Sequence, residues 1–197
     1  MITSMLDNVE REKLKKKEIK RGLILAIIMI LFGTYLFGTK ASPLQYTFSM
    51  IGNKLGHRLS FVIWGVVTGL LLIFCVKKLY DFKSFKDTRA TKLLVWSYIF
   101  LLLTVFIPTL ETLPILKKIH LVTGVAFGIS LMISLFLFLQ FIHESNQELY
   151  NSSMVLFNIV LFGSIGLYFI VGNTGIFEFF FFYTLSIFLF FLQNKLL

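Results

Sequence analysis

SPLQYTFSMIGNKLGHR, residues 42–58, is a polar stretch between two long apolar runs, and it contains a proline, two glycines, an asparagine and a histidine. The runs on either side, residues 22–38 and 59–76, are close to the ~20 apolar residues that a helix needs to cross a hydrocarbon core of ~30 Å. We therefore interpret residues 42–58 as an ordered loop that joins two transmembrane helices.

Further apolar runs follow along the chain, so that the sequence is 57% hydrophobic and only 15% charged. Because a hydrocarbon core offers no water to the backbone, runs of this length predict helices, and the alternating pattern of a transmembrane barrel is absent. The sequence therefore predicts an all-α, polytopic membrane protein with a six-helix transmembrane bundle. The expected spans are residues 22–38, 59–76, 93–110, 119–142, 154–172 and 175–193.

The expected domain organisation is a basic amino-terminal tail, residues 1–21, followed by one transmembrane domain, residues 22–197. The first apolar run is longer than the core of a typical signal peptide and no convincing cleavage site follows it, so we expect a retained helix. Cys75 is the single cysteine, which excludes an intramolecular disulfide and a multi-cysteine metal site.

Basic residues lie unevenly about the expected spans. Fourteen of the nineteen Lys and Arg residues fall in the amino-terminal tail, the second connection and the carboxyl end. The positive-inside rule then places both termini in the cytoplasm and residues 42–58 outside, in a cytoplasmic membrane. These charges flank apolar spans, and the basic tail lacks interleaved aromatic residues, so we expect membrane lipids rather than nucleic acid as partners. Another membrane protein or a second copy of the chain is the other expected partner.

Two spans carry glycine pairs four residues apart, Gly65 with Gly69 and Gly124 with Gly128. Small residues allow close approach of helices in lipid, where no hydrophobic effect drives helices together. We expect both pairs to serve helix packing within the bundle, with homodimerisation as the alternative.

Unusual polar residues gather on the expected outer side of the membrane. Because carboxylates near apolar depth tend to be paired or functional, these residues predict a ligand pocket beneath the loop of residues 42–58, although they would also suit the headgroup zone. Pro108 would kink the third span and open a cleft there. The candidate pocket residues are Ser49, Asn53, His57, Arg58, Glu111, His120 and Glu178, and Asn173 accompanies them.

The histidines give little support for a bound cofactor. His120 and His143 are 23 residues apart in one expected helix, which is ~35 Å at 1.5 Å per residue, so they cannot share one haem. No closely spaced ligand pair supports zinc. The expected spans hold no Asp, Lys or Arg at the midplane, which disfavours an ion-coupled pump. We therefore expect no cofactor, no metal and no assigned catalytic residue.

Two short elements resemble a known family: FSMIGN, residues 48–53, and KKIHLVTGVAFG, residues 117–128. Both are similar to elements of bacterial six-helix membrane proteins grouped as a family of unknown function, which in turn resemble DRAM-like membrane proteins. The resemblance implies a six-helix fold and a role in membrane-lipid organisation, and it implies no catalytic residue set.

The expected function is therefore non-catalytic: lipid interaction, membrane organisation or a role as a partner subunit, with the loop of residues 42–58 capping an outer polar pocket. A membrane-embedded hydrolase that acts on a lipid headgroup through Glu111, His57 and His120 is one alternative. A small transporter is the other.

Overall fold

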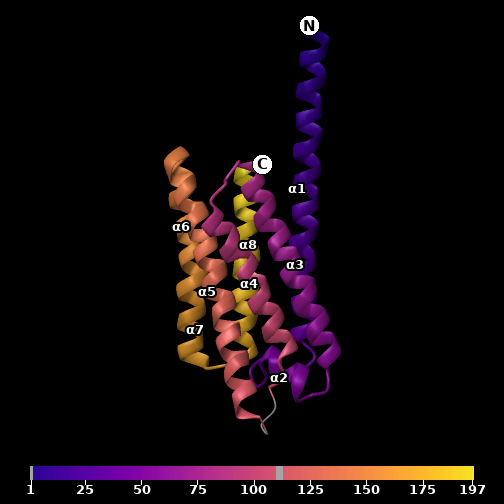
Figure 1. Cartoon of the computed structure of the whole chain (residues 1–197), viewed down its shortest axis with the longest axis vertical. Helices are drawn as coiled ribbons and strands as arrows, with labels where there is room; N and C mark the ends of the chain where they lie inside the picture. Colours follow the sequence, from indigo (N-terminus) through magenta and orange to yellow (C-terminus); the bar gives the residue numbers. More distant parts are fainter. Residues whose placement is uncertain (1, 110–112) are drawn as a thin grey trace.

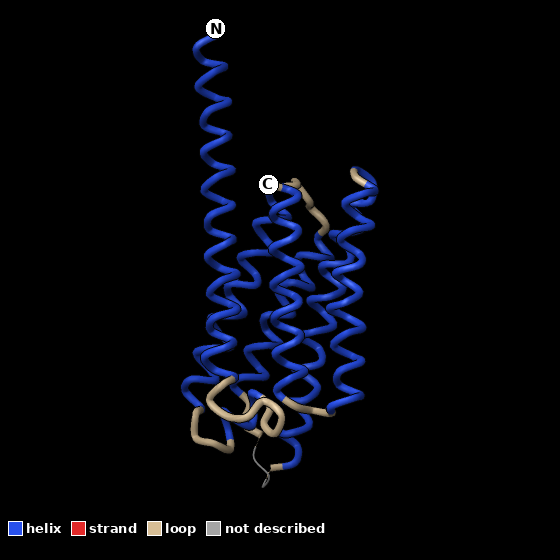
Figure 2. Tube along the Cα trace, turned by 180° about the vertical axis from the view of Figure 1, so that it is seen from behind, coloured by secondary structure: helices blue, strands red, loops and turns tan. Residues whose placement is uncertain are grey.

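The structure is a computed structural model that describes residues 2–109 and 113–197, with only the backbone described for residues 2–12. The described residues are almost entirely helical and include no β-strand (Figures 1 and 2). The elements are α1 Ile2–Gly38, α2 Phe48–Asn53, α3 Arg58–Phe82, α4 Thr88–Phe106, α5 Pro114–Ser145, α6 Gln147–Asn158, the π-helix η1 Ile159–Gly163, α7 Ser164–Val171 and α8 Gly175–Leu196.

Six helices of the described chain are long and apolar enough to cross a membrane, which confirms the predicted all-α, six-helix fold. The fifth of them is composite, because α6, η1 and α7 together form one span, Gln147–Val171. The third ends at Phe106 rather than near residue 110, since Ile107 is extended (φ −83°, ψ 117°). Pro108 follows, and a residue before proline is disfavoured in the α region.

Different elements lie at the two ends of the bundle (Figure 1). One end, called here the α2 end, holds α2 and the connections α4–α5 and α7–α8. The opposite end, called here the amino-terminal end, holds the carboxyl terminus and the side from which α1 projects beyond the bundle. From residue 2 onwards, the predicted tail and the first span therefore form one continuous helix, α1.

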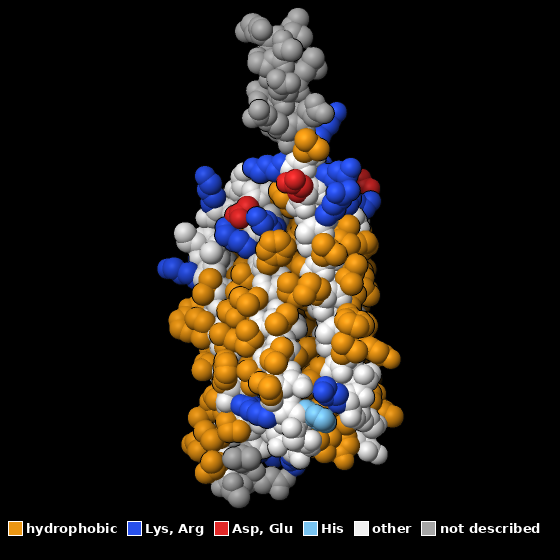
Figure 3. Space-filling view, turned by 90° about the vertical axis from the view of Figure 1, so that its right-hand side faces the viewer, with side chains coloured by type: hydrophobic (Ala, Val, Ile, Leu, Met, Phe, Trp, Pro, Cys, Tyr) orange, Lys and Arg blue, Asp and Glu red, His pale blue; other side chains and the backbone are white. Residues whose placement is uncertain are grey.

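The surface has the banding of a membrane protein. Figure 3 shows hydrophobic side chains covering the middle of one face, with charged side chains gathered towards the amino-terminal end and a few Lys and Arg at the α2 end. Large apolar side chains of the membrane-spanning helices are openly exposed, for example Leu25 at 62% and Leu59 at 74%. Such a surface is unsuited to water and suits lipid.

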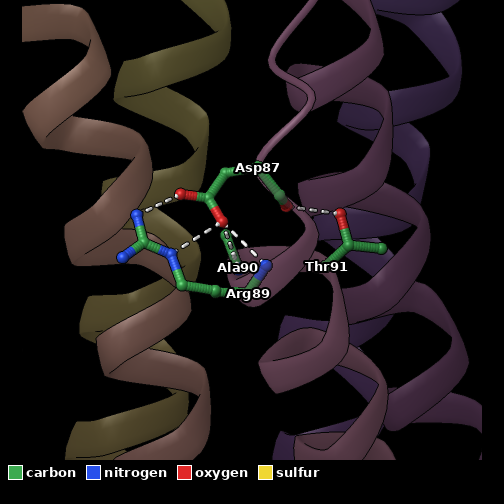
Figure 4. Close-up of polar contacts among 4 residues, drawn as sticks. All are labelled: Asp87, Arg89, Ala90 and Thr91. Atoms are coloured by element: carbon green, nitrogen blue, oxygen red, sulfur yellow. Dashed lines mark hydrogen bonds and ion pairs between the residues drawn. The ribbon is translucent and has the colours of Figure 1, made fainter.

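Buried polar contacts fix three helices at the amino-terminal end. The Tyr80 hydroxyl of α3 lies 2.7 Å from the Ser134 carbonyl of α5, and the Ser134 hydroxyl donates to the Ala90 carbonyl of α4 at 2.6 Å. α4 begins beside them at its N-cap Asp87, whose carboxylate accepts the backbone N–H of Arg89 at 2.7 Å and binds the Arg89 guanidinium at 2.9 Å (Figure 4).

Aromatic packing builds the core at the α2 end. The Phe48 ring of α2 meets Trp64 of α3 at 4.9 Å and Phe179 of α8 at 5.1 Å between centroids, in both cases edge to face. The Trp64 indole N–H donates to the Thr34 hydroxyl of α1 at 3.2 Å, so the ring has its polar atom satisfied while buried. The Phe48 ring also meets Phe37 of α1 at 5.6 Å, so α2 is packed against three membrane-spanning helices.

The two glycine pairs have different surroundings. A Cβ on Gly65 would collide with Val105, and one on Gly69 would lie 2.6 Å from Tyr98, so this pair lets α3 approach α4 closely. In contrast, a Cβ on Gly124 would meet Thr104 only at 3.6 Å, and one on Gly128 would have no atom within 4 Å. Gly124 and Gly128 therefore do not make the close helix contact that we expected. Both residues line a cavity instead.

Candidate functional site

The loop between α1 and α3 folds back onto the start of α8. The Ile176 N–H of α8 donates to the Pro43 carbonyl at 3.2 Å. Gly175 is required here, because a Cβ would lie 2.6 Å from the Tyr46 carbonyl oxygen. Gly56, with φ +78°, makes the turn into α3 that other residues would adopt only with strain. Gly52 lies within α2 and lets α2 approach Phe61.

Glu178, in the first turn of α8, joins that helix to α2. Its Oε2 accepts the Phe48 N–H at 2.5 Å, and Thr47 caps the same helix by accepting the Met50 N–H at 3.1 Å. The first turn of a helix leaves N–H groups unpaired, and a carboxylate there is favoured both as an acceptor and by the helix dipole. Glu178 therefore fixes α2 over the end of the bundle.

The side chains of Arg58 and His120 contact backbone carbonyls at the end of α4. The Arg58 guanidinium donates to the Asn53 amide oxygen at 2.9 Å and to the Phe106 carbonyl at 2.6 Å. His120 Nδ1 lies 3.2 Å from the Ile107 carbonyl. Since a carbonyl only accepts, Nδ1 carries the proton in this contact and Nε2 is the remaining polar atom of the ring. Both side chains satisfy carbonyls that the end of α4 leaves without a helical partner.

A cavity of about 440 Å³ lies beneath α2, between α3, α4, α5, α7 and α8. Its volume is within the range of ~300–1,000 Å³ typical of small-molecule sites. Most of its wall is apolar, and the polar groups include Ser49 and Glu178 near α2. The polar lining residues are Ser49, Thr104, His120, Ser164, Tyr168, Asn173 and Glu178.

The exposure of its lining residues indicates that the cavity opens sideways between α5 and the fifth span. Away from α2 these helices are in contact, through the Gln140–Tyr150 hydrogen bond at 3.2 Å and the Phe136–Phe157 ring pair at 6.0 Å. The π-helix η1 follows, and beyond it both helices line the cavity. The lining residues at this opening are also partly exposed on the outer surface: Leu121 53%, Val125 53%, Ile129 54%, Ile165 45% and Tyr168 42%.

Ser164 is a buried polar group on this wall. It follows η1 directly, is 5% exposed, and its hydroxyl has no hydrogen-bond partner among the described residues. An unpaired buried hydroxyl costs about 1–3 kcal/mol. π-Helices occur often at functional sites because they alter helix geometry locally. A ligand in the cavity would supply the missing partner.

The predicted pocket residues divide into groups. Ser49, His120 and Glu178 line the cavity, whereas Asn53 and Arg58 bind each other and the end of α4. His57 is the N-cap residue of α3, makes no side-chain capping bond and does not line the cavity. Glu111 lies outside the described residues. Within the described chain no three His, Cys, Asp or Glu residues are grouped as metal ligands.

Sequence reasoning did not select the deeper lining residues. Ser164 and Tyr168 resemble ordinary polar residues of a span, and nothing in their spacing indicates the π-helix before them. Gly128 has no atom within 4 Å of an added Cβ, but this space beside the glycine becomes apparent only once the fold is known.

The fold and the cavity define the chain as a polytopic integral membrane protein with a lateral, largely apolar cavity. The chain belongs to the family described as protein of unknown function (DUF998), whose model matches residues 22–193 and thus includes four of the six spans in full and most of the other two. No curated protein and no solved structure matches the chain.

Proposed function

We propose that the protein binds a membrane lipid in the lateral cavity without altering it chemically, and so acts in lipid interaction, in membrane organisation or as a partner subunit. The observation that carries this proposal is the form of the cavity: apolar walls that open between α5 and α7 on the surface that suits lipid, with polar groups beneath α2.

A lipid fits this form better than a water-soluble ligand does. The opening is bordered by exposed apolar side chains such as Val125 and Ile165, so an acyl chain would enter directly from the bilayer. The α5 wall runs from His120 to Met132, which is ~18 Å of helix at 1.5 Å per residue and suits an extended chain. The head would lie near Ser49 and Glu178.

The location and threading of the chain are part of the proposal. We infer that the protein lies in the cytoplasmic membrane of a bacterium with both termini inside, which puts the α2 end and the mouth of the cavity in the outer leaflet. The gathering of Lys and Arg at the amino-terminal end supports this orientation. The resemblance to DRAM-like proteins supports a role in lipid organisation.

Two glycine variants test the proposal. Gly128 and Gly33 are both helical glycines with no atom within 4 Å of an added Cβ, but only Gly128 lines the cavity. Gly128→Leu should fill the cavity, whereas Gly33→Leu should add only a lipid-facing side chain. We expect native mass spectrometry after release from mild detergent to show retained lipid on the wild type and on Gly33→Leu, and its loss from Gly128→Leu.

Equal lipid retention by both variants would contradict a site in the cavity. Incubating the purified protein with the retained lipid tests the non-catalytic part. We expect the lipid to be recovered intact, while protein-dependent release of fatty acid or headgroup would establish the hydrolase alternative instead.

A further inference from the structure

The polar groups of the cavity indicate which kind of lipid it takes. Of the described lining residues, Glu178 is the only carboxylate and His120 the only imidazole, and neither Lys nor Arg is among them. Proteins bind phosphate through Arg and Lys, which supply several charged donors. A carboxylate beneath α2 disfavours an anionic head placed beside it.

The Lys and Arg residues at the α2 end add no positively charged side chain to the cavity lining. Arg58 is engaged by Asn53 and the Phe106 carbonyl, and Lys40 donates to the Ser60 hydroxyl at 3.3 Å. Neither these side chains nor Lys54, Lys117 and Lys118 line the cavity. The head of the ligand therefore meets polar side chains and one carboxylate rather than Lys or Arg.

The cavity offers hydrogen-bonding side chains at two positions, one near α2 and one farther from it. These two positions match a lipid whose head carries hydroxyl groups and is joined to its acyl chain by an ester. Near α2, the Glu178 carboxylate and the Ser49 hydroxyl can accept from hydroxyl groups, a bond that a carboxylate strengthens. Deeper in the cavity, the buried Ser164 hydroxyl has no partner in the described chain and can donate to an ester carbonyl. Apolar walls then receive the chain.

Resting on the lipid-binding function proposed above, we infer that the cavity selects an acylglycerol, whose head is an uncharged glycerol with free hydroxyls, over lipids that carry an anionic phosphate. Glu178 and Ser49 bind the glycerol hydroxyls, and Ser164 binds the ester carbonyl.

Trp64 provides the readout, because it lines the cavity, while Trp96, the other tryptophan of the chain, is 51% exposed and does not. In the full chain carrying Trp96→Phe, emission from Trp64 is titrated with monooleoylglycerol and with oleoyl lysophosphatidic acid, which differ only in the phosphate. We expect monooleoylglycerol to bind about tenfold more tightly, a difference of ~1.4 kcal/mol. Equal or tighter binding of the phosphate lipid would overturn the inference.

Variants in the same background test the assigned contacts. Glu178→Gln keeps an oxygen for the Phe48 N–H but removes the charge, so it should tighten binding of the phosphate lipid and weaken binding of monooleoylglycerol, because an amide oxygen accepts from a hydroxyl less strongly than a carboxylate does. Ser164→Ala should weaken monooleoylglycerol several-fold. Ser186→Ala, a buried serine that binds its own helix backbone at Phe182, should have no effect. Unchanged lipid preference in Glu178→Gln, or unchanged affinity in Ser164→Ala, would overturn the assignment.

The two proposals fail in different ways. If Trp64 emission responds to neither lipid, or responds equally in Gly128→Leu, the lipid-binding function itself fails. If the response depends on Gly128 but favours the phosphate lipid, the cavity binds lipid and only the inference about its head is wrong.

Discussion

Asp87 shows how a single residue starts a membrane-spanning helix at the charged end of the molecule. The hydrogen bond from the Arg89 side chain, supported by the backbone N–H groups of Ala90 and Arg89, lowers the pKa of Asp87 to about 2 (Figure 4). The ionised carboxylate therefore caps α4 over nearly the whole pH range.

Replacing Asp87 should destabilise the protein in a pH-dependent way. Because the pKa of Asp87 is lower in the folded protein, its contribution is complete above the unfolded pKa of ~3.9 and is lost as the pH falls towards about 2. Asp87→Ala should lower the melting temperature in detergent at neutral pH by a few degrees, and the gap to the wild type should narrow below about pH 4.

Asp81→Ala is the control for this measurement. Asp81 pairs with Lys77 one helical turn away, and both side chains are about half exposed, so the loss of this pair should change the melting temperature little. A gap between Asp87→Ala and the wild type that stays constant down to about pH 2 would contradict the capping role.

The end of the bundle at which these polar residues lie could be predicted from the sequence, but their hydrogen-bond partners could not. In the structure Ser49, His120 and Glu178 line one cavity, and Arg58 binds the nearby end of α4. The pattern of spans does not show that Arg58 turns to the end of α4, because that carbonyl becomes available only where Pro108 stops the helix.

The short helix α2 is the element that depends most on such contacts. Six residues are too few to form a stable helix alone, so α2 relies on its packing and on the bonds supplied by Glu178 and Arg58. α2 in turn covers the polar end of the cavity, through Ser49.

Removing the Arg58 side chain should loosen this element. Arg58→Ala breaks the link between Asn53 and the Phe106 carbonyl, so backbone amides in residues 48–58 should exchange hydrogen faster while the spans stay protected. Hydrogen–deuterium exchange followed by mass spectrometry measures this change.

His57→Ala is the neighbouring control, since the His57 side chain makes no capping bond to α3. It should leave exchange in residues 48–58 close to that of the wild type. Faster exchange of equal size in both variants would show that Arg58 has no particular role in fastening α2.

The spans themselves were predictable because membrane thickness fixes helix length. The break in the fifth span was not, because η1 consists of ordinary apolar residues and a glycine, IVLFG, that form a π-helix only in their packed setting. The cavity beside η1 could not be predicted from the sequence either, since it depends on where α5 and the fifth span separate.

At the scale of the whole molecule, the distribution of basic residues should set the orientation in the membrane. Leu44, at the α2 end, is 66% exposed, and Lys86, in the connection before α4, is also exposed. Native Cys75 is 1% exposed and should not react. On intact cells, a membrane-impermeant maleimide should label Leu44→Cys, and should label Lys86→Cys only after lysis.

The wild type, with Cys75 alone, gives the background of this labelling. Labelling of Lys86→Cys on intact cells, with Leu44→Cys protected, would reverse the orientation and place the mouth of the cavity in the inner leaflet.

Lipid occupancy of the cavity in a bilayer can be tested directly by photocrosslinking. A monoacylglycerol with a diazirine in its chain would be incorporated at low density into nanodiscs that hold the wild type, Gly128→Leu or Gly33→Leu, and the labelled peptides mapped by mass spectrometry. We predict labels concentrated in residues 120–132 and 160–168, lost in Gly128→Leu and kept in Gly33→Leu. Labels spread evenly over the outer helix faces and unaffected by Gly128→Leu would show that the cavity holds no lipid.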